Sequence, residues 1–145
     1  MLNHQETCAT QDAQNVRSYT ASASRAKELG ITEGEIQNIV HEFYVKVRND
    51  DVLGPIFEKE MSEEWEQHLA KMCNFWSTVM FGSGLYKGNP MVAHSHIANL
   101  NKALFEHWLI LFERTLTEVC PRAEHVEEFM SRAKRMATVL SSQRK

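Results

Sequence analysis

The stretch "ITEGEIQNIVHEFYVKVRND", residues 31–50, decides the fold class. Its large apolar side chains return every three to four residues, which is the period of one face of an α-helix. They are Ile36, Ile39, Val40, Phe43, Tyr44 and Val47. Thr32 followed by Glu35 fits a capping box, which satisfies the amides at a helix start, and Asn49 and Asp50 are expected to end the helix. The stretch therefore predicts an amphipathic helix with one face in a core.

Three further stretches show the same period. They cover residues 62–81, about 101–119 and about 123–141. Ser62 is the expected N-cap of the first of them, Gly82 follows its end, and Pro121 ends the second. The sequence shows no period-two alternation typical of β-strands. The pattern predicts an all-α domain with four principal helices.

The connections between the expected helices differ in kind. "LGPIF", residues 53–57, predicts a tight corner, because Pro55 disfavours helical geometry at Gly54. Residues 82–100 form the longest connection, with at most a short helix near its end. Long connections inside a compact domain are more often functional than short ones. This connection is therefore a candidate for part of a functional site.

Two histidines, His94 and His96, stand in this connection, within "KGNPMVAHSHI". In a helix, residues two apart lie on different faces, so the pair is not expected to share one metal ion. No cysteine or acidic residue stands nearby, which leaves zinc with little support. A single axial imidazole on a haem iron needs only one histidine and a large apolar cavity. That alternative stays open at this point.

Three polar side chains fall on or near the apolar helix faces. Tyr44 lies on the inner side of the first helix, His68 shares a face with Met72, and Trp108 stands among leucines. Taken singly, each has an ordinary explanation: a core tyrosine bonded to a carbonyl, a boundary histidine, and bulk for the core. Periodicity alone does not choose between these explanations and a functional site.

The composition describes an ordinary globular protein of 145 residues, with 43% apolar and 24% charged residues. A net charge of −3 argues against nucleic-acid binding, and no apolar run has the length of a membrane span. Three widely spaced cysteines, Cys8, Cys73 and Cys120, argue against a disulfide framework. Together with the absence of a signal-peptide pattern, they lead us to expect a cytoplasmic protein.

The N-terminal residues differ from the rest of the chain. Residues 1–30 are rich in Ser, Thr, Ala, Gln and Asn and lack apolar periodicity. We expect a mobile N-terminal extension there, with at most one short helical turn before Gly30. A single domain is expected over residues 31–145.

Four blocks in series resemble the group III truncated haemoglobins of bacteria. They are "FYVKVRNDDVLGPIF" from residue 43, "EEWEQHLAKMCNFW" from residue 63, "YKGNPMVAH" from residue 86 and "FEHWLILFERTL" from residue 105. The resemblance covers about residues 31–140. It implies a truncated globin fold, which is a two-over-two helical sandwich around a haem b group (iron protoporphyrin IX).

The resemblance also implies roles for particular residues. Tyr86, Gly88 and Pro90 match the block that leads to the proximal iron ligand, so His94 is the expected ligand and His96 is a loop residue. Tyr44, His68 and Trp108 match the polar residues on the distal side, where an external ligand binds. The remaining cavity-lining positions implied by the resemblance are Phe57, Met72, Phe75 and Trp76. Lys46, Arg48 and Lys87 are the candidate partners of the haem propionates.

The function implied by the resemblance is the binding of dioxygen, nitric oxide and other diatomic ligands. The iron is expected to be five-coordinate or gated by His68, which is a further donor, a swinging gate or an internal iron ligand. A redox role in nitric oxide dioxygenation or peroxide chemistry needs an unidentified reductase. The alternatives are a non-catalytic dioxygen store or ligand sensor, and a haem-free helical interaction domain.

Overall fold

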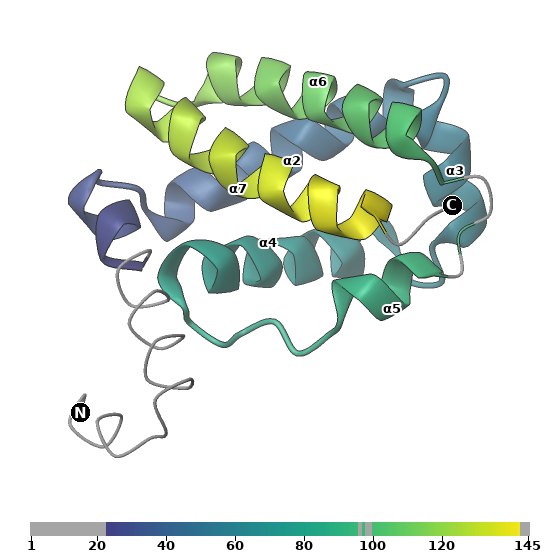
Figure 1. Ribbon diagram of the computed structural model, residues 1–145, viewed down its shortest axis with the longest axis horizontal. Helices are drawn as coiled ribbons and strands as arrows, with labels where there is room; N and C mark the ends of the chain where they lie inside the picture. The colour runs from purple at the N-terminus through teal and green to yellow at the C-terminus, as the bar shows by residue number, and fades with distance from the viewer. Residues whose placement is uncertain (1–22, 96, 98–99, 143–145) are drawn as a thin grey trace.

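The computed structural model describes residues 23–95, 97 and 100–142. Every regular element within these residues is a helix, which confirms the all-α prediction (Figure 1). The elements are α2 (Glu33–Asn49), α3 (Leu53–Glu60), α4 (Trp65–Phe81), α5 (Pro90–Ser95), α6 (Lys102–Val119) and α7 (Ala123–Ser142). A short helical stretch over residues 23–28 precedes them. No helix among the described residues is long and apolar enough to cross a membrane.

Helix α2 begins and ends close to where the sequence predicts. The hydroxyl of Thr32 accepts a hydrogen bond from the Glu35 amide at 3.1 Å, and the predicted apolar face is buried. Asp50 follows the last turn, and its carboxylate accepts hydrogen bonds from the amides of Val52 and Leu53 at 3.0 and 2.8 Å. Asp50 therefore ends α2 and also satisfies amides at the start of α3.

Two local predictions are wrong. "LGPIF" is not a corner, because Gly54 and Pro55 both lie in the first turn of α3. Proline is tolerated in a first turn, where its missing N–H has no helical partner to lose. Ser62 is not the N-cap of α4, because Glu64 precedes the first helical residue, and the Glu64 amide donates to the side chain of Gln67 at 3.4 Å.

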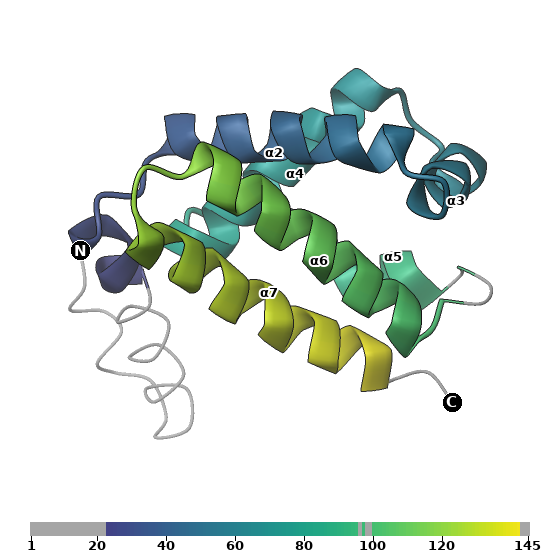
Figure 2. The ribbon, with the colours of Figure 1, turned by 90° about the horizontal axis from the view of Figure 1, so that it is seen from above.

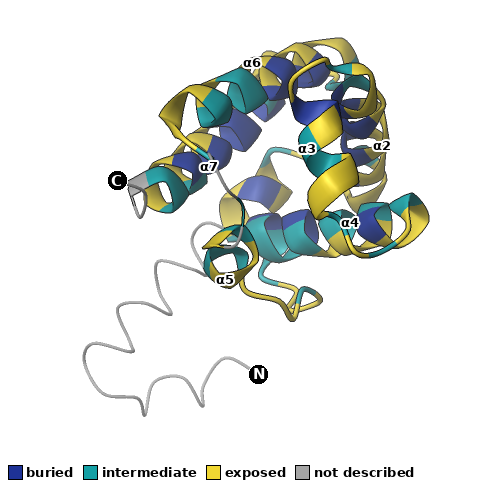
Figure 3. Cartoon of the chain, turned by 90° about the vertical axis from the view of Figure 1, so that its right-hand side faces the viewer, coloured by how far each residue is buried: buried dark blue, intermediate teal, exposed yellow. Residues whose placement is uncertain are grey.

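The long helices form two layers. Helices α6 and α7 make an antiparallel hairpin, and α2 contacts both α6 and α4 (Figures 1 and 2). Figure 3 looks along this arrangement from the side of α3. The buried faces of α2, α4, α6 and α7 turn toward a common interior, and α5 contacts α7. The arrangement is the two-over-two sandwich.

Aromatic rings join the two layers. Phe112 of α6 lies edge-on to Phe43 of α2 at 5.1 Å between ring centroids and stacks on Trp76 of α4, also at 5.1 Å. Phe129 of α7 also packs on Trp76, with 5.7 Å between ring centroids. Burying four large rings in this way removes much apolar surface from water, which makes the cluster a main source of stability.

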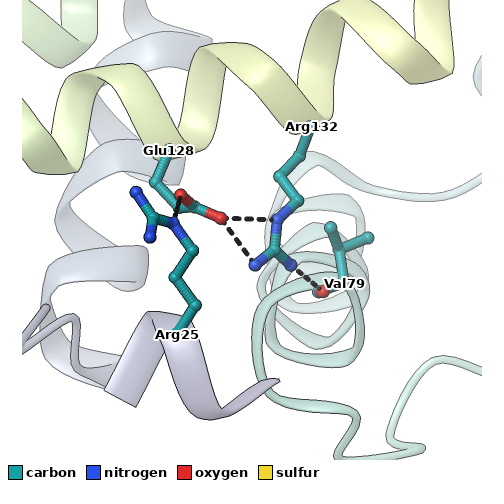
Figure 4. Close-up of polar contacts among 4 residues, drawn as sticks. All are labelled: Arg25, Val79, Glu128 and Arg132. Atoms are coloured by element: carbon teal, nitrogen blue, oxygen red, sulfur yellow. Dashed lines mark hydrogen bonds and ion pairs between the residues drawn. The ribbon is translucent and has the colours of Figure 1, made fainter. Parts of the chain in front are cut away.

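A buried carboxylate ties the N-terminal stretch to the sandwich through an ion pair (Figure 4). The carboxylate of Glu128 in α7 accepts hydrogen bonds from Arg25 at 2.8 Å and from Arg132 at 2.7 and 3.0 Å. Arg132 also donates to the Val79 carbonyl of α4 at 2.6 Å. Glu128 and Arg132 are buried. One carboxylate thus joins α7 to the stretch before α2 and, through Arg132, to α4.

His125 makes a second buried polar link. Its Nδ1 lies 2.7 Å from the carboxylate of Glu35, and its Nε2 lies 2.6 Å from the carbonyl oxygen of Leu29. Ala26, one turn before Leu29, is fully buried in the core. Of the expected mobile extension, residues 1–22 lie outside the described residues, and residues 23–30 include this helical stretch.

Candidate functional site

An apolar cavity of about 410 Å³ lies between the two layers. All the cavity residues implied by the family resemblance line it: Tyr44, Phe57, His68, Met72, Phe75, Trp76, His94 and Trp108. All six helices named above contribute residues to these positions and to the neighbouring apolar walls. The volume lies in the range typical of cavities that enclose a small organic ligand or cofactor.

His94 reaches the cavity from the short helix α5. The side chain of Asn89 accepts hydrogen bonds from the amides of Met91 and Val92 at 3.0 and 3.4 Å, which supports the start of this helix. The Nδ1 atom of His94 lies 2.7 Å from the carbonyl oxygen of Pro90. Because a carbonyl only accepts, Nδ1 carries a hydrogen, and the lone pair of the neutral ring is on Nε2. A metal-binding imidazole is commonly oriented by such a bond.

His68 reaches the cavity from α4. Its Nδ1 lies 3.1 Å from the carboxylate of Glu63, and its ring lies edge-on to Tyr44 at 5.0 Å between centroids. Burial lowers the pKa of His68, against the raising effect of Glu63. The Nε2 atom is buried without a hydrogen-bond partner among the described residues. A buried polar atom without a partner is uncommon and points to a missing ligand.

Tyr44 reaches the cavity from α2. Burial raises the pKa of its phenol far above the ordinary value, so the hydroxyl keeps its hydrogen. Within the part of the chain that the structure describes, no group accepts a hydrogen bond from this hydroxyl. Tyr44 therefore offers a neutral donor to whatever occupies the cavity.

Trp108 supplies a second aromatic donor from α6. Its indole stacks on Phe112 and lies edge-on to Phe43, both at 4.9 Å between centroids. These two contacts hold the ring in place while it forms part of the cavity wall. An indole N–H donates and cannot accept. Trp108 and Tyr44 can therefore both donate a hydrogen bond to a ligand.

The candidate propionate partners are dispersed. Lys46 pairs with Glu118 at 2.6 Å. The Arg48 guanidinium lies 4.6 Å above the Trp65 ring, in a cation–π contact, and Lys87 does not line the cavity. The lysine on the cavity wall is Lys71, which sequence reasoning did not select.

Sequence reasoning also missed Glu63, the partner of His68 and Lys71. In the sequence it was an ordinary acidic residue at a helix start. The spacing from Glu63 to His68 is five residues, which is not a standard side-chain pairing on a helix, so no pattern identified it. The apolar wall from α7, including Ala133, Met136 and Leu140, was predicted only as core.

The residues present fit a haem group. The cavity is apolar, the His94 ring is held in a metal-binding tautomer, and the Nε2 of His68 has no partner. Within the described residues, no group of three or more His, Cys, Asp or Glu side chains is placed to hold a metal ion. A porphyrin supplies the other metal ligands itself, so one axial imidazole suffices.

The comparisons with known proteins agree with this arrangement. The bacterial-like globin family matches residues 27–142, so the chain belongs to the globins, which hold haem and bind diatomic ligands such as dioxygen through it. Within them it belongs to the group III truncated haemoglobins. It is 40% identical over 92 residues to the group 3 truncated hemoglobin ctb of Campylobacter jejuni, covering 61% of this chain and 72% of that protein.

The likeness extends to a solved structure. The crystal structure of a group III truncated hemoglobin from Campylobacter jejuni matches with a TM-score of 0.73 and 34% sequence identity. The match covers 78% of this chain and 91% of that one. The truncated globin fold implied by the four sequence blocks is therefore confirmed.

Proposed function

We propose that the protein holds haem b through Nε2 of His94 and acts in redox chemistry on dioxygen and nitric oxide. The reaction it suits best is dioxygenation of nitric oxide, with peroxide chemistry as a related activity. The observation that carries the proposal is the cavity wall itself, where the Pro90-oriented imidazole of His94 and the Tyr44 donor line one apolar space.

Bound haem supplies a coordination position for a diatomic ligand and one-electron chemistry at its iron. The apolar walls around that position keep water out, which strengthens every electrostatic contact inside. The Pro90 carbonyl accepts the hydrogen on Nδ1 of His94, so the lone pair of the neutral ring is on Nε2.

Tyr44 and Trp108 act on the ligand by donating hydrogen bonds to an atom that gains negative charge. Fixed donors aimed at developing charge are effective because they need no reorganisation. A hydrogen bond to a charged acceptor contributes about 1.5–3 kcal/mol, equivalent to roughly 10-fold to 150-fold in a dissociation rate. Two such donors favour slow release of dioxygen, although contributions within one network are seldom additive.

Slow release favours chemistry over transport. A carrier must give up dioxygen readily, whereas a protein that retains it gives a second molecule, such as nitric oxide, time to enter and react. Repeated turnover requires an electron donor, and we assign this role to a separate reductase. The free thiols of Cys73 and Cys120 suit a reducing compartment, so we place the activity in the cytoplasm.

Stopped-flow mixing tests the proposal. The reduced, haem-loaded protein saturated with dioxygen is mixed with nitric oxide, and nitrate is measured at the end of the reaction. We expect one nitrate for each haem within the mixing experiment, and repeated turnover when a reductase and its electron source are added. Nitric oxide that simply replaces dioxygen, without nitrate, would identify a dioxygen store or a ligand sensor instead.

A further inference from the structure

Glu63 connects the cavity histidine to a lysine. One oxygen atom, Oε2, lies 2.8 Å from Nζ of Lys71 and 3.1 Å from Nδ1 of His68. Glu63 stands just before α4, and His68 and Lys71 follow three residues apart on that helix, so one helical turn brings the two donors together. All three residues line the cavity.

The charge state of Glu63 determines which nitrogen of His68 carries the hydrogen. The Lys71 ammonium, with a smaller effect from His68, holds the pKa of Glu63 below its ordinary value, against the opposing effect of burial. An ionised carboxylate only accepts hydrogen bonds. Nδ1 must therefore donate, and in the neutral ring the lone pair is on Nε2.

The surrounding rings hold this orientation. His68 lies edge-on to Tyr44, Phe57 and Trp65, with centroids 5.0, 5.8 and 5.7 Å away. Its side chain is only 11% exposed. A flip that exchanged the two nitrogens would break the bond to Glu63 and would also disturb this packing. The orientation is thus fixed by a charge and by the shape of its surroundings.

We propose that Glu63 is a positioning residue that sets the tautomer of His68, so that Nε2 presents a lone pair to the cavity. The inference rests on the proposed function, because it concerns the side of the haem where the ligand binds. It excludes one of the three roles that the sequence left open for His68. A lone pair allows His68 to bind iron or to accept a hydrogen bond, and it removes the role of a third donor to a negatively charged ligand.

The tautomer is measured in the ferrous carbon monoxide form, which is diamagnetic. Nitrogen-15 NMR of labelled histidine rings shows which nitrogen of His68 is protonated. In the wild type, the tautomer with the hydrogen on Nδ1 should be at least about ten times as populated as the tautomer with the hydrogen on Nε2. This ratio corresponds to a hydrogen bond to a charged acceptor. In Glu63→Leu we expect a substantial fraction of molecules with the hydrogen on Nε2.

The infrared stretching frequency of carbon monoxide gives a second measurement. A hydrogen bond donated to the carbon monoxide oxygen favours negative charge on that atom and lowers the stretching frequency. In Glu63→Leu, Nε2 of His68 can donate such a bond, so this variant should show a new band at lower frequency. That band should disappear when His68→Leu is added. Glu66→Leu is the matched control, because Glu66 is an exposed carboxylate in the first turn of the same helix. Lys71→Met keeps the acceptor and should keep the wild-type tautomer.

Two results would overturn the inference: a hydrogen on Nε2 in the wild type, or an unchanged tautomer in Glu63→Leu. Failure of the proposed function looks different. If the protein does not hold haem, the wild type forms no stable carbon monoxide complex, and if it holds haem without the proposed redox activity, nitric oxide replaces dioxygen without forming nitrate. A complex that forms normally but carries the hydrogen on Nε2 would contradict the role of Glu63 and leave the role of His94 intact.

Discussion

The Nδ1 atom of His94 lies 2.7 Å from the carbonyl oxygen of Pro90, one turn earlier in α5. This contact explains why a helix of only six residues suffices to present the side chain. The carbonyl of Pro90 orients the ring, and the Asn89 side chain satisfies amides at the helix start. The Tyr-x-Gly-x-Pro-x-x-x-His block is thus a structural unit in which the proline carbonyl and the histidine act together.

The first prediction concerns His94 as the iron ligand. His94→Gly should remove the bond from protein to iron and weaken haem binding by at least tenfold, measured by haem transfer to an acceptor protein. Added imidazole should restore a Soret spectrum close to that of the wild type, because it refills the space left by the ring. His96→Ala should keep the wild-type spectrum, although His96 lies outside the described residues. The opposite pattern would place the ligand two residues later.

The second prediction concerns the Tyr44 hydroxyl. Tyr44→Phe removes a donor and preserves the ring contacts with Phe43 and His68. Dioxygen should leave the reduced, haem-loaded protein about 10-fold to 150-fold faster, the range expected for one hydrogen bond to a charged acceptor. The measurement is stopped-flow displacement of dioxygen by carbon monoxide. Tyr86→Phe is the control, because Tyr86 also lines the cavity, and equal effects in both variants would rule out a specific role for Tyr44.

The third prediction concerns the close packing of α3 on the end of α2. A Cβ atom at Gly54 would lie 3.0 Å from the carbonyl oxygen of Arg48 and 3.3 Å from that of Val47. Backbone atoms move little, so Gly54→Ala should lower the free energy of unfolding by about 1–3 kcal/mol. Urea unfolding of the haem-loaded protein measures this change.

Gly34 is the matched control for Gly54. A Cβ atom there would meet only the Thr32 hydroxyl, at 3.8 Å. Because alanine is a better helix former than glycine, Gly34→Ala should be neutral or stabilising by up to about 1 kcal/mol. If Gly54→Ala were equally harmless, the contact between α3 and the α2 terminus would not be as close as described.

The fourth prediction concerns the pH dependence of the Glu128 ion pair. Burial raises the pKa of Glu128, but hydrogen bonds from Arg25 and Arg132 outweigh it, and the net pKa is below the ordinary value of 4.5. A carboxyl with a lowered pKa in the folded state stabilises the fold above its ordinary pKa. This stabilisation is lost as the pH falls through the pKa of the folded state.

Glu128→Gln tests this linkage. At pH 7 it should lower the free energy of unfolding by roughly 1–3 kcal/mol, because the buried Arg132 loses its charged partner. The difference from the wild type should shrink as the pH falls below 4.5. Glu127→Gln, at an exposed position of the same helix, should have little effect at any pH. If the difference in free energy of unfolding between the wild type and Glu128→Gln stayed constant with pH, the charge of the carboxylate would not be its cause.

The helices and the proximal block were predictable because their signals are local. The apolar period of residues 31–50, the cap at Thr32 and the breaks near Gly82 and Pro121 depend on neighbours within a few residues. The four sequence blocks added the globin fold, since their order and spacing are specific. Gly54 shows the limit of local rules, because the sequence did not show that Pro55 lies in a first turn, where it is tolerated.

The amino-acid sequence by itself determined the helices, the resemblance to the family and some of the residues that line the cavity, including Tyr44, His68 and His94. Only the tertiary structure decided which polar groups meet across distance: Glu128 with Arg25, His125 with the Leu29 carbonyl, and Glu63 with the cavity histidine. The physical reason is that helix formation follows the order of residues along one segment, whereas hydrogen bonds and ion pairs depend on which faces pack together. The tautomer of His68 likewise depends on the tertiary structure, since we infer that the neighbouring carboxylate of Glu63 sets it.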